Sequence, residues 1–389
     1  MTTQHTAIEW TDRTWNPVTG CTKVSPGCDN CYAATIAHRF AGSKAFPDGF
    51  DVTVHEDRVD QPYRWKKPAR VFVNSMSDLF HQDVPDLFIT HVFDVMEANP
   101  QHTFQVLTKR HARMRSFVQR REQLRREYAA KFDDCPTEAM RNSPAAKMAR
   151  ARAARPPANI WLGVSVENQK WADIRIPALL ETPAAVRFLS CEPLLGPVDL
   201  SRWLRPVPGC GHVAADDGTC THLDAMTPEC HRWADCPARA RYEDWHGLDW
   251  VIVGGESGPK ARAMHPDWAR QIRDACDVAG VPFFFKQWGE WGPAPFIVRV
   301  CDPDEGWHGT DEELAAAKKD SEARGATHVH TGHSREENGE RQYWLHEIGH
   351  KPWSLERVGL PAGAAAIRRW GKKRAGRELD GRLHDAFPA

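Results

Sequence analysis

The sequence predicts an α/β protein whose parallel strands form a complete or partial barrel. Apolar runs alternate with stretches of helical periodicity. The runs are apolar on both faces, which is typical of parallel strands covered on both sides. One strand is expected before a cysteine-rich loop near the N-terminus. Six more are expected at 71–78, 103–110, 159–168, 186–197, 250–258 and 282–291.

Helices are expected between these strands, most clearly at 84–99 and 265–280. The second should begin near Pro266 and Asp267 and end on Gly280. Glycine is favoured there because the residue after a helix often adopts a left-handed conformation.

Polar side chains follow the predicted strands, and in α/β barrels the active site lies at those C-terminal ends. Loops that are polar only because they are solvated are the alternative. The candidate rim residues are Ser75, Ser77, Asp78, Lys109, Ser165, Glu167, Asn168, Glu192, Glu256, Ser257, Lys286 and Gln287.

Composition indicates a soluble globular protein. The 389 residues are 41% hydrophobic and 26% charged, with a net charge of −1. The N-terminus lacks a signal-peptide pattern and no apolar run approaches membrane-spanning length, so a cytoplasmic location without a membrane partner is expected. In that compartment the eleven cysteines are expected as metal ligands or core residues rather than disulfides.

Charge and cysteine content divide the chain. Residues 109–155 hold fourteen Lys or Arg against five Asp or Glu, an excess of +9. A solvated basic helix and a phosphate-contacting surface are the two interpretations. The expected units are a barrel (1–204 and 248–360), a basic helical insertion within it (109–158), a Cys/His-rich insert (205–247) and a basic C-terminal segment (361–389).

Three cysteines lie close together in the turn-rich loop after the first strand. Cys21, Cys28 and Cys31 are spaced C-x6-C-x2-C. Three thiolates on a four-iron, four-sulfur (4Fe–4S) cluster leave one iron free for a small chelating molecule. With His38, the same cysteines would instead supply a Cys3His zinc site. The cysteines alone leave both interpretations open.

The position of this loop, between the first strand and the helical stretch YAATIAHRF, resembles that in radical S-adenosylmethionine (SAM) enzymes. The usual spacing there is C-x3-C-x2-C, with an aromatic residue before the third cysteine. Here the first gap is six residues, Asn30 holds the aromatic position and Tyr32 follows the last cysteine.

A second resemblance covers nearly the whole chain. The blocks GCTKVSPGCDNCYA, NSMSDLFH, VLTKR, LGVSVEN, FLSCEPLLGP, WVIVGGESGP, FFFKQWGEW and AGRELDGRLHDAFP are similar to the phage-associated family named for its three-cysteine motif. NSMSDLFHQDVP also resembles the segment after the second strand in spore photoproduct lyase-like enzymes. These resemblances imply a barrel of the radical SAM type that uses a 4Fe–4S cluster and SAM.

The resemblance also implies residue roles. Cys21, Cys28 and Cys31 would bind the cluster. Glu192, Glu256 and Lys286 become catalytic candidates facing the substrate. The expected cofactor-binding residues are Tyr32, Ser77, Asp78, Ser165, Glu167, Asn168, Gly254 and Gly255. Cys191 is expected to pack in its strand as a small hydrophobic residue.

The insert at 205–247 predicts a structural zinc site. It is too small to build its own core, and metal binding can supply the folding energy that it lacks. His212, His222 and His231 lie among its cysteines, and the default ligand set is Cys210, Cys220, Cys230 and Cys236.

Two functions follow. The first is an enzyme that cleaves SAM to a 5′-deoxyadenosyl radical and modifies or repairs nucleic acid; its partners would be DNA, RNA or a nucleotide, and an electron donor. The second is a zinc-stabilised nucleic-acid-binding protein of a phage or mobile element, without catalysis. Trp288 and Trp291 are expected to be buried, with base stacking as the alternative.

Overall fold

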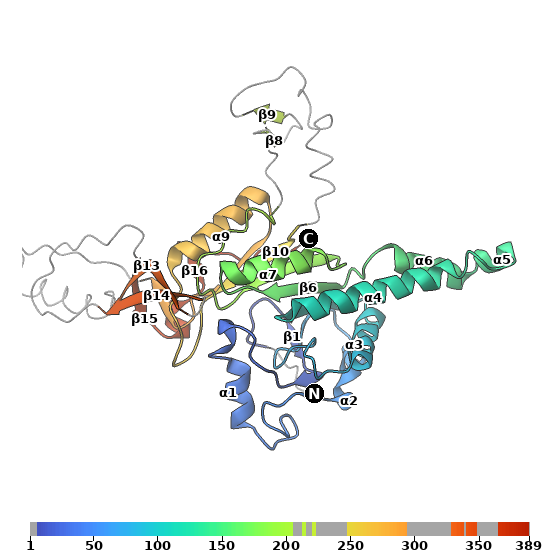
Figure 1. Ribbon diagram of the computed structural model, residues 1–389, viewed down its shortest axis with the longest axis horizontal. Coiled ribbons are helices and arrows are strands. Elements are labelled where there is room, and N and C mark those ends of the chain that lie inside the picture. Colours follow the sequence, from blue (N-terminus) through green and yellow to red (C-terminus); the bar gives the residue numbers. More distant parts are fainter. Residues whose placement is uncertain are drawn as a thin grey trace, which may run out of the picture.

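In the computed structural model, a seven-stranded parallel sheet forms the centre of the molecule (Figure 1). The structure describes residues 6–204, 247–293 and 365–388, and the backbone of four strands at 212–214, 220–222, 328–337 and 340–347. The sheet contains, in spatial order, β1 (Arg13–Trp15), β4 (Arg70–Val73), β5 (Thr103–Thr108), β6 (Ile160–Ser165), β7 (Val186–Cys191), β10 (Trp250–Gly254) and β11 (Phe283–Gln287).

Every neighbouring pair in this sheet is parallel. Strands β1 and β11 form its two edges and do not pair with each other, so the described sheet is an open, partial barrel. The predicted α/β class and all seven strands are confirmed. Several strands end earlier than expected; β4 stops before Asn74, whose φ of 60° leaves the extended region.

Helices follow the strands as the sequence predicts. They include α1 (Tyr32–Arg39), α2 (Glu56–Val59), α3 (Asp86–Ala98), α4 (His111–Ala130), α7 (Gln169–Leu180) and α9 (Pro266–Ala279). Gly280 ends α9 with a φ of 63°, as expected. No helix in the described ranges is long and apolar enough to cross a membrane.

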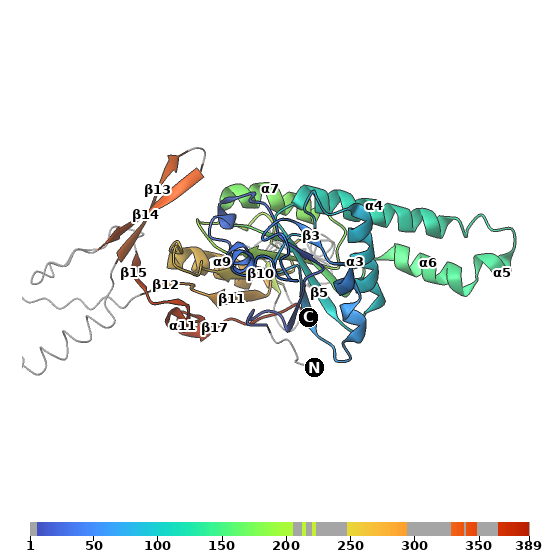
Figure 2. The ribbon, with the colours of Figure 1, turned by 90° about the horizontal axis from the view of Figure 1, so that it is seen from below.

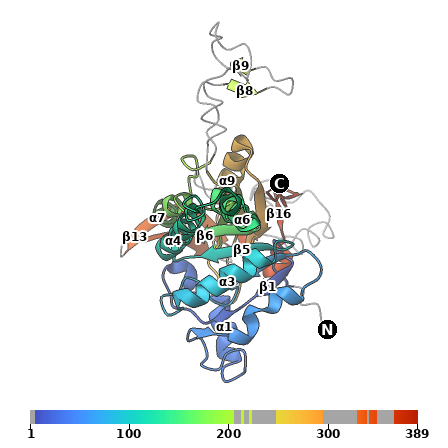
Figure 3. The same ribbon diagram turned by 90° about the vertical axis from the view of Figure 1, so that its right-hand side faces the viewer.

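Alternating residues of each strand bury opposite faces of the sheet. Val251 and Val253 of β10 belong to the large cluster shared with the helices, whereas Trp250 and Ile252 belong to a second cluster on the other face. Figure 3 shows the helices around the curved sheet. The second cluster consists of Trp10, Phe72, Phe188, Trp250, Ile252 and Phe284, with Trp161 and Phe387 packed against it.

A helical hairpin projects from this body (Figure 2). It consists of α4, α5 (Glu138–Arg141) and α6 (Pro144–Ala154). Ser143 caps α6 by accepting a hydrogen bond from the amide of Ala146 at 3.2 Å. The hairpin, residues 111–155, is called the arm below.

The smaller elements lie around the sheet. Strands β2 (Val18–Thr19) and β3 (Thr53–Val54) pair, as do β8 (His212–Ala214) with β9 (Cys220–His222) and β16 (Glu378–Leu379) with β17 (Arg382–Leu383). A four-stranded sheet has the order β12 (Trp291–Pro293), β15 (Ala365–Arg369), β13 (His328–Glu337) and β14 (Glu340–Glu347). Helix α11 (Lys372–Ala375) follows β15.

Candidate functional site

The cysteine loop lies against the C-terminal ends of the strands. Cys21, Cys28 and Cys31 are free thiols and each is partly exposed. Gly20 starts the loop with a φ of 83° and forms a parallel bridge to Ser77 beyond β4. A Cβ on Gly20 would lie 2.0 Å from the Asp51 carbonyl oxygen, so only glycine fits this entry.

Arg110, just after β5, makes the first contact with the loop. One guanidinium nitrogen lies 3.3 Å from the sulfur of Cys21 and 3.2 Å from a carboxylate oxygen of Asp78. The other donates to the hydroxyl of Thr22 at 2.9 Å. Burial raises the pKa of the Cys21 thiol to about 11, and the charge of Arg110 opposes part of that rise.

Asp78 accepts hydrogen bonds on both carboxylate oxygens. Thr108 donates its hydroxyl at 2.7 Å and Lys109 its amide at 3.0 Å, in addition to the contact with Arg110. Asp78 is therefore engaged in holding Arg110 beside the cysteine loop. Its expected contact with SAM stays a prediction.

Glu167, after β6, makes the second contact. Ser25 in the loop donates its hydroxyl to one carboxylate oxygen at 2.7 Å, and Arg175 of α7 donates to the other at 2.9 Å. The Glu167 and Arg175 side chains are both 0% exposed. A Cβ on Gly27 would lie 2.5 Å from the Glu167 carboxylate, so the loop backbone packs directly on this group.

Glu256, after β10, makes the third contact. It accepts from Asn30 at 3.0 Å and from the Arg262 guanidinium at 2.6 Å, while Arg262 also donates to the Pro26 carbonyl at 2.9 Å. Burial alone would raise the pKa of Glu256, but the hydrogen bonds and charge of Arg262 outweigh it, so the pKa is lowered. Glu256 is thus an ionised anchor for the loop.

A separate charged pair lies at the ends of β7 and β11. Lys286 is 2.9 Å from one carboxylate oxygen of Glu192, and Ser190 donates to the other at 3.1 Å. Strand alternation puts Ser190 and Lys286 on the same sheet face as the aromatic cluster, because Phe188 and Phe284 are two residues earlier. A Cβ on Gly254 would come within 2.7 Å of Glu192.

Four more of the predicted residues are buried or bonded within the protein. Ser77 donates to the Val18 carbonyl at 2.9 Å. Asn168 caps α7 by accepting from the Trp171 amide at 3.3 Å. Tyr32 donates its hydroxyl to the Ser75 carbonyl. Ser165 is buried. Their cofactor contacts stay predictions.

Gly255 lies where only glycine fits. An added Cβ would be 1.9 Å from the Trp288 carbonyl oxygen. Ser257 accepts a hydrogen bond from the Gln287 amide at 3.1 Å, which joins the ends of β10 and β11.

Sequence reasoning named the carboxylates of this site but missed their arginines. Arg110, Arg175 and Arg262 are the partners that join Asp78 to Cys21 and hold Glu167 and Glu256. Arg110 alone had a sequence signal, because it directly follows Lys109 at a predicted strand end.

The three thiols of the loop are a donor set that a 4Fe–4S cluster can use. Among the described residues, no three His, Cys, Asp or Glu side chains are grouped to hold one metal ion, so the Cys3His set with His38 is not assembled. A 4Fe–4S cluster binds each thiolate through a different iron, and its ligands therefore stand farther apart. Three free, partly exposed thiols with a guanidinium beside one of them suit that chemistry.

Three other expectations can be compared with the structure. Cys191 is fully buried, as predicted. Trp288 and Trp291 are 3% and 9% exposed and donate their indole N–H groups to Glu378 and Ala261 carbonyls, so buried packing is confirmed. The side chains of the expected zinc ligands Cys210, Cys220, Cys230 and Cys236 lie outside the described residues.

Fold and site together define an α/β partial-barrel protein with a three-cysteine loop anchored at the strand ends. The chain belongs to the family described as "Protein of unknown function (DUF5131)", whose model matches residues 5–388. Comparison with curated proteins gives no match. The expected link to phages stays a prediction.

Among solved structures, the chain is similar to three of spore photoproduct lyase. A cysteine-to-serine mutant shares 14% identity and a TM-score of 0.31, covering 80% of this chain and 73% of that one. A complex with dinucleoside spore photoproduct has 12% sequence identity and a TM-score of 0.28, and the match covers 79% of this chain and 71% of that one. A tyrosine-to-phenylalanine mutant has 13% sequence identity and a TM-score of 0.30, and the match covers 79% of this chain and 71% of that one.

Proposed function

We propose that the chain is an iron–sulfur enzyme of the radical SAM type, with Cys21, Cys28 and Cys31 as the cluster ligands. The observation that carries the proposal is the anchoring of one loop by three carboxylates. Asp78 acts through Arg110, Glu167 bonds Ser25 directly, and Glu256 bonds Asn30 and Arg262. The loop is thereby fixed at the strand ends, where α/β barrels carry their active sites.

The cluster would supply one-electron chemistry. Held by Cys21, Cys28 and Cys31 and given one electron by an external donor, the cluster would support reductive cleavage of SAM to methionine and would thereby start hydrogen abstraction from the substrate. The chain's own residues hold and orient the reactants. Arg110 places positive charge beside the Cys21 sulfur, which favours the thiolate form that binds iron.

Glu192 and Lys286 are proposed to orient the substrate. They are only 14% and 18% exposed and form an ion pair near the edge that holds the cysteine loop. A partly buried pair of this kind offers an acceptor and a donor in fixed positions. Nucleic acid or a nucleotide is the proposed substrate, because the chain's positive charge is concentrated in 109–155 while its net charge is −1.

The first test is iron loading after anaerobic reconstitution. Cys21→Ala, Cys28→Ala and Cys31→Ala should each lose the cluster and the broad absorption near roughly 400 nm that iron–sulfur charge transfer gives. Cys135→Ala is the matched control, because Cys135 is also a partly exposed free thiol but lies in the arm. A full four-iron complement in any of the first three variants would contradict the assignment.

The second test is the reaction itself. Reconstituted protein, SAM and a chemical one-electron reductant should release 5′-deoxyadenosine and methionine in equal amounts. Arg110→Ala should lower the iron content, whereas Glu192→Gln should retain iron but lose turnover of a true substrate. A colourless protein that binds zinc and releases no 5′-deoxyadenosine would support the alternative of a zinc-stabilised binding protein.

A further inference from the structure

We propose that the arm, residues 111–155, is the surface on which a single nucleic-acid strand docks beside the cysteine loop. The proposal deepens the nucleic-acid substrate class proposed above and rests on it. Helix α4 begins at His111, directly after the Arg110 that contacts Cys21. Its 20 residues extend about 30 Å at 1.5 Å per residue. The arm therefore leads from the candidate site into solvent (Figure 2).

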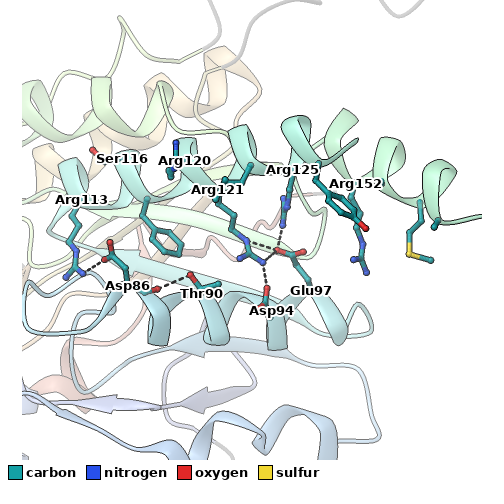
Figure 4. Close-up of a pocket in the computed structure, with 16 residues that line it drawn as sticks. Asp86, Thr90, Asp94, Glu97, Arg113, Ser116, Arg120, Arg121, Arg125 and Arg152 are labelled. Carbon is teal, nitrogen blue, oxygen red and sulfur yellow. Dashed lines mark hydrogen bonds and ion pairs between the residues drawn. The ribbon is translucent and has the colours of Figure 1, made fainter. Parts of the chain in front are cut away.

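Part of the positive charge of the arm is neutralised by ion pairs within the chain. Arg113 pairs with Asp86 at 2.5 Å, and Arg121 pairs with Asp94 at 2.5 Å and with Glu97 at 2.7 Å. Figure 4 shows these contacts between α4 and α3. The other ion pairs are Arg125 with Glu97 and Glu122, Arg115 with Glu181, and Arg150 with Asp133. Four of these arginines, Arg113, Arg115, Arg121 and Arg125, fix the arm to the body, whereas Arg150 pairs within the arm. Arginines paired in this way are less available to a ligand.

A second set of cations has no such partner. Six exposed side chains of the arm make no ion pair or hydrogen bond within the part of the chain that the structure describes. Only three of the arm's carboxylates, Glu127, Asp134 and Glu138, lack a cation there. The unpaired cations therefore outnumber the unpaired carboxylates two to one. They are Arg120, Arg126, Lys131, Lys147, Arg152 and Arg155.

Exposed apolar surface accompanies these cations. A groove of about 750 Å³ lies between α3, α4 and α6. Its lining includes the carboxylates of α3 with the arginines that pair with them, and the unpaired Arg120 and Arg152. Its apolar lining includes Leu124, Tyr128 and Met148, which are 48%, 57% and 57% exposed. An exposed aromatic ring among free cations is the combination that single-stranded nucleic acid uses, because bases stack on the ring and phosphates contact the cations.

The charge distribution favours this occupant over a second copy of the chain. A symmetric contact would bring Arg120 and Arg152 against the same residues of the partner, and like charges repel. An acidic peptide shares the attraction to the cations but has no base to stack on Tyr128. The experiments below separate the two.

The first experiment measures fluorescence anisotropy of a labelled oligothymidylate of about 20 nucleotides, longer than one such binding site. Full-length protein without reconstituted iron is titrated between about 50 and 200 mM salt. The double variant Arg120→Gln/Arg152→Gln should bind more weakly and reduce the slope of log K against log salt by about 1.4, roughly 0.7 for each lost phosphate contact.

Lys66→Gln/Lys67→Gln is the control with the same charge change. These two exposed lysines precede β4 at the opposite end of the sheet and make no described ion pair. For this control variant, the slope of log K against log salt should equal that of the wild type. Absence of binding at low salt, or an equal slope change in both double variants, would overturn the proposal. Melting temperatures verify that each variant is folded.

The second experiment tests stacking. Tyr128→Ala should weaken oligothymidylate binding about fivefold or more, and Tyr128→Phe should preserve it, because base–aromatic stacking contributes about 1–3 kcal/mol. Poly-L-glutamate is the comparison probe, and its binding should not respond to either variant. If both polymers bind equally well and Tyr128→Ala changes neither, the arm is a site for acidic protein and the proposal is wrong. Neither experiment needs the cluster, so failure here is distinguishable from failure of iron loading.

Discussion

At the scale of single residues, the buried Glu167–Arg175 pair supports the cysteine loop. Both side chains are 0% exposed, and Glu167 also accepts from Ser25. Removing one partner of a buried pair leaves an uncompensated charge, which costs about 3–5 kcal/mol. Lys109 lies 3.8 Å from the Glu167 carboxylate and compensates part of its charge. Arg175→Ala should therefore lower the free energy of unfolding by at most about that amount, as measured by urea denaturation.

The control for this prediction is an exposed ion pair with a similar nitrogen–oxygen distance. Arg202 and Asp173 lie 3.1 Å apart, but their side chains are 66% and 47% exposed. Exposed pairs contribute about 0–1 kcal/mol, so Arg202→Ala should change stability little. Equal losses in the two variants would show that burial does not set the effect. Arg175→Ala should also reduce iron loading, a change not expected from Arg202→Ala.

His102 should make stability depend on pH. The ring is 1% exposed and bonds the Trp65 carbonyl at 3.2 Å. Burial lowers its pKa from the ordinary 6.5, with a smaller lowering from Arg13 and opposition from backbone carbonyls. Because the unfolded state binds the proton more readily, the contribution is fully present above pH 6.5 and is lost as pH falls through the folded-state pKa.

The variant His102→Gln removes this titration and retains an amide donor. Subtracting its unfolding free energy from that of the wild type at several pH values isolates the histidine from other groups. The difference should shrink as pH falls below about 6.5, the unfolded value. A difference that stays constant or grows on acidification would contradict the assigned direction.

The sequence allowed the acidic half of the site to be predicted, but not the basic half. Asp78, Glu167 and Glu256 follow parallel strands, whose C-terminal ends meet at one edge, so their proximity could be inferred. Arg175 is eight residues beyond Glu167 inside α7. Its inward direction depends on how that helix packs on the sheet, which a linear pattern of charges does not specify.

At the scale of elements, Gly280 shows how a single backbone conformation ends a helix. Its φ is 63°, and a Cβ there would have no heavy atom within 4 Å, so any penalty comes from the backbone alone. Gly280→Ala should cost about 1 kcal/mol of unfolding free energy. Gly280→Asn should cost less, since asparagine tolerates the left-handed region better. Equal costs for Ala and Asn, measured in urea, would contradict this explanation.

The arm shows where charge counting fails at this scale. Composition predicted a basic helix in 109–155 and left open whether it is solvated or binds phosphate. In the structure, the arginines of α4 fall into two groups. Arg113, Arg121 and Arg125 pair with carboxylates of α3 and α4, whereas Arg120 and Arg126 have no described partner. The acidic face of α3 lies earlier in the sequence, so the excess within one segment overstated the free charge.

At the scale of the whole molecule, the number of strands could be predicted from the sequence, but whether they close into a complete barrel could not. Six runs that are apolar on both faces, and one further strand expected before the cysteine loop, predicted a parallel sheet, and all seven strands pair in it. Whether β1 meets β11 depends on curvature. Trp10 and Phe387, from outside the strands, pack with Phe72 and Trp250 on one face of the sheet. These contacts join the two ends of the described chain and have no local sequence signal.

The insert at 205–247 should be separable from the barrel because its flanks meet. Leu248 donates its amide to the Trp203 carbonyl at 3.2 Å, and Trp203, Leu204 and Leu248 belong to the main core. A short Gly/Ser linker in place of 205–247 can therefore connect positions that are already adjacent, and loop closure costs little. We expect the shortened protein to fold, to load iron as the full chain does, and to lose zinc bound through Cys210, Cys220, Cys230 and Cys236. Metal analysis of both proteins, with iron and zinc measured in the same sample, checks this. Unchanged zinc would exclude the proposed zinc site, whereas loss of iron together with zinc would show that the insert supports the cysteine loop.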